Sequence, residues 1–311
     1  MAEILVTGGA GYIGSVLVPM LLEKGHNVTV LDCFLYKQAS LLDCCKYNSF
    51  EIICGDCRDE ETLKKALKGK DIVIPLAAVV GFPACDKDKT AAKTTNLGAI
   101  ETLLKLRKPE QKIIFPCTNS GYGIGQGQNY CTEDSPIEPV SLYGKTKMQA
   151  EKAILESGNS VTFRFATLFG ASPRMRTDLL VNDFVYRAVF DRSLIVFEGS
   201  FMRNYLHVRD AARAFIFAIE NFEKMNGETF NCGLSDANLS KLELCAIIKK
   251  LVPSFTFLEA PIGVDPDKRN YLVSNQKIEN IGFKPMFSIE DGVKELLKVY
   301  SIIKNSNYSN I

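Results

Sequence analysis

The sequence predicts a doubly wound α/β fold, in which helices cover both faces of one parallel sheet. Strand-like and helix-like stretches alternate through the first half, at the spacing typical of such folds. Several strand-like runs are continuous, apolar and β-branched, as expected when both faces of a strand are buried. The chain of 311 residues is long enough to bury a substantial core. The predicted strands are Glu3–Thr7, Asn27–Leu31, Phe50–Cys54, Asp71–Leu76, Lys112–Phe115 and Ser160–Phe165, and the predicted helices are Ile13–Lys24, Glu60–Leu67, Thr94–Leu106 and Leu142–Glu156.

The pattern becomes less regular after Gly170. Helices are predicted at Leu180–Phe190 and Asp210–Asn221, and the last third mixes short elements with several prolines. We therefore predict a first domain over residues 1–170 and a smaller α/β domain over residues 171–311. Residues 204–222 are expected to pack back on the first domain, and the tail from Asn305 is expected to be disordered.

Composition excludes several classes of protein. Lys and Arg number 37 against 36 Asp and Glu, so the sequence lacks the basic excess of a nucleic-acid or membrane-surface protein. The longest apolar stretch, Ile72 to Ala84, contains two prolines and is too short to span a bilayer. The chain starts directly with a strand-like run, so we expect no signal peptide and a cytoplasmic protein with reduced thiols.

No metal site is predicted. The 10 cysteines are scattered and there are only 2 histidines. Cys54 and Cys57 form a lone CxxC without the second pair or the histidines that zinc requires. Small buried residues beside a loop are the better interpretation of this pair.

A glycine-rich turn follows the first predicted strand and opens the first helix. Gly8, Gly11 and Gly14 have the GxxGxxG spacing, with Tyr12 and Ile13 between the last two. Such glycines permit a tight turn and let the backbone approach a pyrophosphate at the positive end of the helix. Because the strand–turn–helix context is correct, the motif predicts a Rossmann-type dinucleotide-binding domain.

Acidic residues at the ends of the next two strands refine this prediction. Asp32 ends the second strand, where a carboxylate accepts hydrogen bonds from the adenosine ribose and repels a 2′-phosphate. The predicted cofactor is therefore NAD. Asp56 and Cys57 follow the third strand and are expected near the adenine, although Asp56 equally fits a helix-capping role.

Three further residues form a candidate catalytic group. Tyr143 and Lys147 are four residues apart and share one helix face. A tyrosine with an ordinary pKa near ~10 needs a lowering of roughly 3 units to act as a base near neutrality. The ammonium of Lys147 and a positive nicotinamide ring are predicted to supply it. Thr118 follows the fifth strand and offers a hydroxyl that relays a proton.

Together these motifs resemble the extended short-chain dehydrogenase/reductase family, in its nucleotide-sugar epimerase and dehydratase branch, over nearly the whole chain. The resemblance implies a catalytic triad of Thr118, Tyr143 and Lys147. It also implies that Leu76, Ala77, Ala78 and Asn96 lie on the nicotinamide side, and that the protein is a homodimer or homotetramer.

The second half of the chain extends the resemblance to the substrate. Arg203, in an RNYLHV segment, and Arg269 are implied to bind the diphosphate of a nucleotide sugar, which suits guanidinium groups. Asn182 matches a substrate-side Asn, whereas Thr167 stands where the family has Asn. Arg174 and Arg176 form either substrate contacts or surface salt bridges. His207 is interpreted as structural.

The resemblance implies that Tyr143 accepts the proton of the C4 hydroxyl while the C4 hydride passes to NAD. A 4,6-dehydratase needs an acid and a base beside the triad threonine, but Asn119 and Ser120 occupy those positions. Both are expected to contact the sugar, and dehydration is disfavoured.

Two outcomes then remain, net oxidation to a 4-keto sugar and C4 epimerisation of the UDP-glucose 4-epimerase type. The residues of segment 172–176 resemble the sugar-modifying enzymes of bacterial capsular polysaccharide pathways, including GDP-manno-heptose 4-dehydrogenases, and favour net oxidation. A non-catalytic NAD-sensing regulator is a third alternative, although such proteins have lost the triad that this chain retains.

Overall fold

The computed structural model describes residues 1–125, 127, 129–263 and 269–304, so the tail predicted to be disordered lies outside the described residues. Seven parallel strands form the main sheet, in the order β3-β2-β1-β4-β5-β7-β11. They are β1 (Glu3–Thr7), β2 (Asn27–Asp32), β3 (Phe50–Cys54), β4 (Ile72–Pro75), β5 (Lys112–Thr118), β7 (Ser160–Phe165) and β11 (Thr229–Cys232). This is the predicted doubly wound Rossmann-type architecture.

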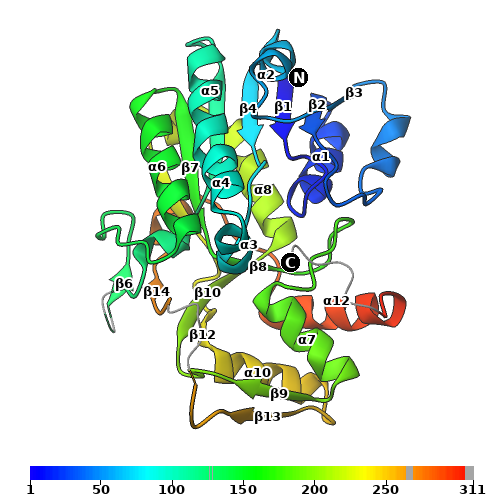
Figure 1. Cartoon of the computed structure of the whole chain (residues 1–311), viewed down its shortest axis with the longest axis vertical. Coiled ribbons are helices and arrows are strands. Elements are labelled where there is room, and N and C mark those ends of the chain that lie inside the picture. Colours follow the sequence, from blue (N-terminus) through cyan, green and yellow to red (C-terminus); the bar gives the residue numbers. More distant parts are fainter. Residues whose placement is uncertain (126, 128, 264–268, 305–311) are drawn as a thin grey trace.

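Helices bury both faces of this sheet (Figure 1). Leu5 on β1 packs in one core with Leu63, Leu103 and Ile154, whereas its neighbours Ile4 and Val6 point into the opposite core. All three β1 side chains are fully buried, which explains the unbroken apolar run. The helices of the first core are α2 (Glu60–Leu67), α5 (Ala99–Leu106) and α6 (Leu142–Glu156), and those of the second are α1 (Gly14–Glu23) and α8 (Val208–Glu220).

The strand order reverses at β1. From β1 the sheet grows through β2 and β3 on one side and through β4, β5, β7 and β11 on the other. The loops that follow β1 and β4 therefore leave in opposite directions and open a crevice at the carboxyl ends of the strands. Ligands of doubly wound sheets bind at such a reversal.

A second group of elements lies below this edge of the sheet in Figure 1. Its core contains Val185, Leu244 and Leu296, contributed by three different helices. The elements are α7 (Leu180–Phe190), α10 (Lys241–Leu251) and α12 (Ile289–Ile302), the sheet of β8 (Thr167–Phe169), β10 (Met202–His207) and β12 (Asn238–Ser240), and the pair β9 (Ser193–Val196) and β13 (Thr256–Glu259). Shorter elements are β6 (Tyr130–Cys131) paired with β14 (Leu272–Val273), α3 (Phe82–Lys87), α4 (Lys89–Lys93), α9 (Phe222–Met225) and α11 (Gln276–Asn280).

The chain after residue 170 returns to the first group of elements. Helix α8 packs against α1, and β11 extends the main sheet by pairing with β7. These contacts show that α8 and β11, from the later part of the chain, complete the main sheet and its helical cover. The division at residue 170 stays a prediction.

Two predicted elements differ from the structure by more than two residues at one end. The strand expected to end at Phe115 continues through Pro116 to Thr118, because β7 pairs with it over that length. The helix expected over 94–106 is divided into a π-helical turn, η2 (Thr94–Gly98), and α5. None of the described helices combines the length and apolar character that a membrane span needs. The cytoplasmic location and the homodimer or homotetramer stay predictions.

Candidate active site

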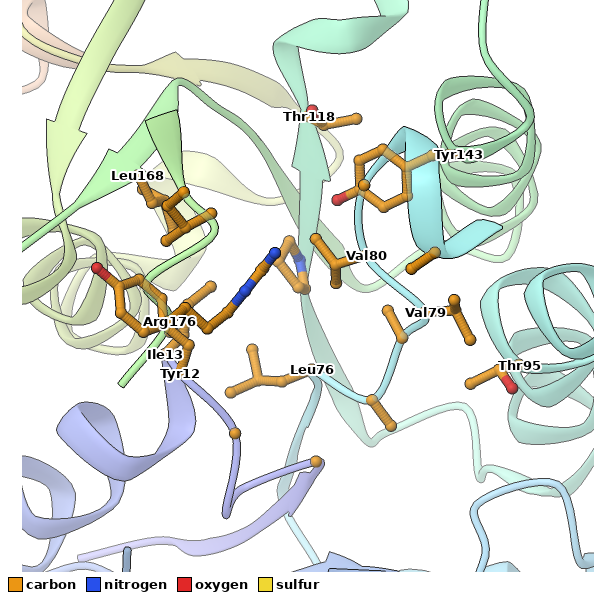
Figure 2. Close-up of a pocket in the computed structure, with 18 of the residues that line it drawn as sticks. Tyr12, Ile13, Leu76, Val79, Val80, Thr95, Thr118, Tyr143, Leu168 and Arg176 are labelled. Carbon is orange, nitrogen blue, oxygen red and sulfur yellow. The ribbon is translucent and has the colours of Figure 1, made fainter. Parts of the chain in front are cut away.

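A deep cleft of about 1030 Å³ opens at the carboxyl ends of the strands. One wall comes from the loops after β1, β2, β3 and β4, and the other from β8, the segment leading to α7, and β10. Figure 2 shows Thr118 and Tyr143 at one end of the cleft and Arg176 reaching toward its centre from the opposite wall. Most residues that the sequence singled out line this one cleft.

The glycine-rich loop requires residues without a side chain. Gly8 has a φ of +70°, and a Cβ there would lie 2.6 Å from the backbone nitrogen of Ala77. A Cβ on Gly14 would lie 2.4 Å from the carbonyl oxygen of Gly9. The loop therefore folds tightly over the N-terminus of α1, with Gly11, Tyr12 and Ile13 also lining the cleft. This cradle fits the pyrophosphate of a dinucleotide.

Asp32 is fixed at the end of β2. Its Oδ2 accepts a hydrogen bond from the Ala10 nitrogen at 2.9 Å, and its Oδ1 accepts one from the Phe34 nitrogen at 2.8 Å. A carboxylate has about four acceptor positions, so two bonds leave capacity for ribose hydroxyls. Because Asp32 also lines the cleft, it fits the predicted role at the ribose of NAD.

Asp56 and Cys57 line the cleft beside Arg58. Arg58 Nη2 lies 2.5 Å from Asp56 Oδ2, and this bond keeps the pKa of Asp56 below its usual value. The capping alternative for Asp56 is wrong, because the N-cap of α2 is Asp59, whose side chain accepts from the Thr62 nitrogen at 2.8 Å. Burial raises the pKa of the Cys57 thiol to about 12, so it is not a nucleophile near neutrality.

Leu76, Ala77 and Ala78 line the cleft after β4, and their place on the nicotinamide side stays a prediction. Asn96 lies behind this wall rather than in the lining. Its Oδ1 accepts from the Val79 nitrogen at 2.8 Å, and its Nδ2 donates to the Val79 oxygen at 2.9 Å. The Asn96 side chain therefore pairs with the main chain of the loop as a neighbouring strand would. Its predicted direct contact with the cofactor is corrected to a positioning role.

The three candidate catalytic side chains lie around the end of β5. Thr118 is the last residue of that strand, and its hydroxyl donates to Ser120 Oγ at 2.9 Å. Tyr143 and Lys147 lie on α6, which begins where the Ser141 side chain accepts from the Gly144 nitrogen at 3.1 Å. All three line the cleft, and Lys147 Nζ lies 3.9 Å from the centre of the Phe115 ring.

Burial is the main influence on the pKa values of Tyr143 and Lys147. It raises the pKa of Tyr143 well above its usual value, against the smaller lowering by Arg176 and Arg269. The lowered pKa that the sequence predicts for Tyr143 is therefore not a property of the protein alone. Burial also lowers the pKa of Lys147 to about 8, which places its proton within reach of physiological pH.

The predicted diphosphate ligands meet at the same end of the cleft. Arg269 Nη1 donates to Ser120 Oγ, and Arg203 Nη1 donates to the main-chain oxygen of Arg269. Both arginines and Thr167 line the cleft. Arg269 therefore connects Arg203 with Ser120, which lies beside Thr118, and two guanidinium groups at this position suit a diphosphate.

The remaining predicted substrate residues divide into two groups. Arg176 lines the cleft and forms a buried ion pair with Asp178, with Nε and Oδ1 3.2 Å apart. Asn182 lies behind the wall, where its Nδ2 donates to the Arg176 oxygen at 2.8 Å. Asn119 is buried outside the lining. The expected sugar contacts of Asn119 and Asn182 are therefore corrected, because both side chains point into the protein.

The sequence analysis did not single out several cleft residues, among them Asp178, Lys241 and Tyr271. Lys241 begins α10, far along the chain, and no local motif marks it. Tyr271 follows Arg269 by two residues, so strand alternation offered a weak signal. His207 lies outside the cleft lining, where Nδ1 accepts from the Arg209 nitrogen at 3.2 Å and caps α8.

Comparison with known proteins agrees with this geometry. Residues 4–233 match the model of the NAD dependent epimerase/dehydratase family, and the chain belongs to that family. The low-salt glycan biosynthesis protein Agl12 of Haloferax volcanii is 28% identical, over 96% of this chain and 98% of that protein. The UDP-glucose 4-epimerase of Lactobacillus helveticus is 27% identical, over 94% of each.

Solved structures show the same fold. The UDP-glucuronic acid 4-epimerase of Bacillus cereus, in complex with UDP-glucuronic acid and NAD, has a TM-score of 0.84 at 25% identity, over 97% of this chain and 100% of that one. The family match identifies this chain as an NAD-dependent enzyme, and the relatives named here act on nucleotide sugars where their names state a substrate.

Proposed function

We propose that the protein oxidises C4 of a UDP-linked sugar with NAD and returns the hydride to the opposite face, which is C4 epimerisation. The observation that carries this proposal is the arrangement of one cleft. Thr118, Tyr143 and Lys147 lie beside Ser120, and Ser120 is bonded in turn to Arg269 of the candidate diphosphate site. The reacting sugar would therefore lie between the triad and the two arginines.

The chain's own residues supply proton transfer and orientation. Tyr143 accepts the C4 hydroxyl proton, through Thr118 where a relay is needed, and Lys147 stabilises the phenolate. Bound NAD would supply the hydride acceptor, and its positive ring would lower the pKa of Tyr143, which burial raises. Arg203 and Arg269 hold the diphosphate while the sugar presents each face in turn.

Two observations favour epimerisation over the other reactions of the family. Asn119 and Ser120 offer no acid and base for loss of water across C5 and C6. The relatives named above include a UDP-glucose 4-epimerase and a UDP-glucuronic acid 4-epimerase, and none of their names mentions a GDP-linked heptose. The comparisons therefore support the UDP-sugar alternative better than GDP-manno-heptose oxidation.

Net oxidation to a free 4-keto sugar remains the second candidate. Thr167 lines the cleft where the resemblance expects Asn, which removes an amide contact to the substrate. A sugar held less firmly would be released at the keto stage, leaving NADH on the enzyme. The capsule-pathway GDP-manno-heptose remains the finer substrate hypothesis within this candidate.

One experiment separates the outcomes. The purified enzyme is incubated with UDP-, GDP-, CDP- and dTDP-sugars, while absorbance at 340 nm follows NADH and NMR identifies the product. A product inverted at C4 without accumulated NADH supports the proposal, whereas a 4-keto product with one equivalent of NADH supports net oxidation. A 4-keto-6-deoxy product contradicts both. If no sugar in the panel reacts while NAD binds normally, the non-catalytic regulator becomes the better hypothesis.

A further inference from the structure

Two oppositely charged side chains face the candidate triad across the cleft and have no part in the proton transfer described above. Arg176 and Asp178 both line the cleft, and each side chain is only 9% exposed. Figure 2 shows Arg176 extending from the opposite wall into the space toward which the Tyr143 hydroxyl points. Burial raises the pKa of Tyr143 and the charge of Arg176 opposes this, so the two groups lie within electrostatic reach of each other. A sugar whose C4 hydroxyl meets Tyr143 would therefore approach Arg176 with a neighbouring part of its ring.

The guanidinium of Arg176 is held in one orientation. Its Nε donates to Asp178 Oδ1 at 3.2 Å, and its Nη2 donates to Asp178 Oδ2 in parallel. The main-chain oxygen of Arg176 accepts from Asn182 Nδ2 at 2.8 Å, so the backbone is fixed as well. Because a bidentate pair sets the plane of the fork, the Nη1 edge keeps a defined direction. This edge has no hydrogen-bond partner among the described residues, which leaves its hydrogens for a ligand.

This wall of the cleft carries no excess of positive charge. Asp178 neutralises Arg176, and a second carboxylate, Asp183 in the first turn of α7, also lines the cleft. Arg187 Nε lies 2.9 Å from Asp183 Oδ2, but Arg187 itself lies outside the lining. Burial raises the pKa of Asp183, and the nearby charge of Asp178 also raises it. The wall therefore offers a hydrogen-bond donor together with negative charge, and both bear on the sugar that it accepts.

The C6 group of a hexose decides how well the sugar suits such a wall, because C6 lies close to C4. A neutral hexose carries a hydroxymethyl group there, whose oxygen accepts a hydrogen bond from a guanidinium without bringing a charge. A hexuronic acid carries a carboxylate at C6, which would have to displace Asp178 or lie beside it. Displacement breaks a buried ion pair, and proximity places like charges together in a poorly solvated cleft, so both arrangements are unfavourable.

We propose that Arg176 and Asp178 form a specificity pair, in which Arg176 donates from Nη1 to a hydroxyl of a neutral hexose and the charge of Asp178 rejects a hexuronic acid. This inference rests on the proposed reaction at C4, because Tyr143 sets the place of the sugar. It narrows the proposed substrate from any UDP-linked sugar to a UDP-linked neutral hexose. The diphosphate would be bound by Arg203 and Arg269 in either case, so the two kinds of ligand would differ only at this wall.

The test compares two ligands that differ only at C6, UDP-glucose and UDP-glucuronic acid. Each is titrated by calorimetry into the enzyme loaded with NADH, which cannot accept a hydride, so that binding is measured apart from turnover. Asp178→Asn removes the negative charge and keeps the shape, and Arg176→Met removes the fork and keeps the apolar stem. Asp236→Asn and Arg192→Met are the matched controls, because both residues are exposed and lie outside the cleft lining.

We expect the unmodified enzyme to bind UDP-glucose about 10- to 100-fold more tightly than UDP-glucuronic acid, which is the effect of one charge-assisted contact. Asp178→Asn should reduce this ratio by about tenfold, mainly through tighter binding of the uronic acid. Arg176→Met should weaken the binding of UDP-glucose by about tenfold. The two controls should leave the ratio unchanged, and NADH affinity should be unchanged in every variant.

Three results would overturn the inference and leave the proposed epimerisation intact. The first is an unmodified enzyme that binds UDP-glucuronic acid as tightly as UDP-glucose. The second is a folded Asp178→Asn variant that keeps the full ratio, and the third is an Arg176→Met variant that loses NADH affinity as strongly as sugar affinity. If neither ligand binds the unmodified enzyme, the proposed UDP-sugar function fails and the inference fails with it. Should Asp178→Asn not fold, the unmodified enzyme and Arg176→Met decide.

Discussion

At the scale of single residues, burial disfavours the charged forms of both Tyr143 and Lys147. The structure raises the pKa of the phenol and lowers that of the ammonium to about 8, so neither charge is favoured in the closed cleft by itself. The phenolate becomes accessible when positive charge surrounds it. We therefore expect Tyr143 to become a stronger base when the positive nicotinamide ring is bound.

Replacing Tyr143 with Phe tests this arrangement. The change removes one hydroxyl, so folding and NADH binding should be retained, whereas turnover should fall by about 10²–10⁴-fold with the loss of the base. In the unmodified enzyme saturated with NAD, whose positive ring lowers the pKa of Tyr143, kcat/KM for the sugar should rise as Tyr143 ionises and fall above a pH of about 8, where Lys147 loses its proton. The residual activity of Tyr143→Phe should lack the rise of kcat/KM on the acidic side of the pH profile. Turnover over a pH series and calorimetric NADH titration make both measurements, and an unchanged acidic limb would exclude Tyr143 as the base.

At the scale of elements, helix α6 shows which parts of the structure the sequence determines locally. Its bounds match the prediction at both ends, because Ser141 caps one end and the apolar periodicity ends with Glu156. The glycine-rich loop, Asp32 and the three candidate catalytic residues could also be singled out from the sequence, since each motif is contiguous or adjoins a clear strand, and the structure brings them to one cleft. Helices α3 and α4 were missed, because Pro75 and Pro83 bound an apolar stretch that resembles a loop.

The rest of the site depends on tertiary contacts that no local pattern contains. Lys241 reaches the cleft from α10, and Arg174 is placed by hydrogen bonds to α1. Asn119 follows the catalytic threonine directly, yet its side chain turns into the protein as the 3₁₀ turn of residues 119–122 begins. Its position next to Thr118 in the sequence predicted that Asn119 contacts the sugar. In the structure the turn that begins at Asn119 leaves this residue buried outside the cleft lining.

A buried ion pair holds the catalytic helix against the sheet. Glu151 lies one turn after Lys147 on α6, and its Oε2 accepts from Arg164 Nη2 on β7 at 2.9 Å. Arg164 also donates to the Tyr122 hydroxyl at 3.0 Å, in the turn that follows Thr118. The pair therefore joins the helix of Tyr143, the strand β7 and the turn beside the triad threonine.

Glu151→Gln should lower the free energy of unfolding by about 3 kcal/mol, because it leaves the Arg164 cation buried without its carboxylate. The double change Glu151→Met with Arg164→Met should recover part of this loss, since apolar residues of similar size need no desolvated charge. Urea unfolding of Glu151→Met, Arg164→Met and the double variant measures the coupling between the two residues. A double variant that loses the sum of both single effects would show that the two residues stabilise the fold independently.

At the scale of the whole molecule, the parts of the chain before and after residue 170 contribute to the same sheet and to the same cleft. Strand β11 covers the edge of β7, and α8 packs against α1. Phe163 and Phe165 on β7 contact Phe215 of α8, with ring centres 5.8 Å and 5.4 Å apart. The cleft is shared in the same way, because the glycine-rich loop and triad come from before residue 170, and Arg174, Arg203 and Arg269 from after it.

A fragment of residues 1–170 should therefore fail to fold as a cooperative unit, although it contains the complete dinucleotide-binding motif. Removing α8 and β11 exposes the phenylalanines on β7 and leaves the backbone of that strand unpaired, which favours aggregation. Circular dichroism during urea titration and NADH fluorescence compare the fragment with the full chain. We expect no sharp transition and no NADH binding by the fragment. A cooperative transition together with NADH binding would instead establish the predicted boundary at residue 170 as a true domain boundary, with the later chain contributing only the substrate site.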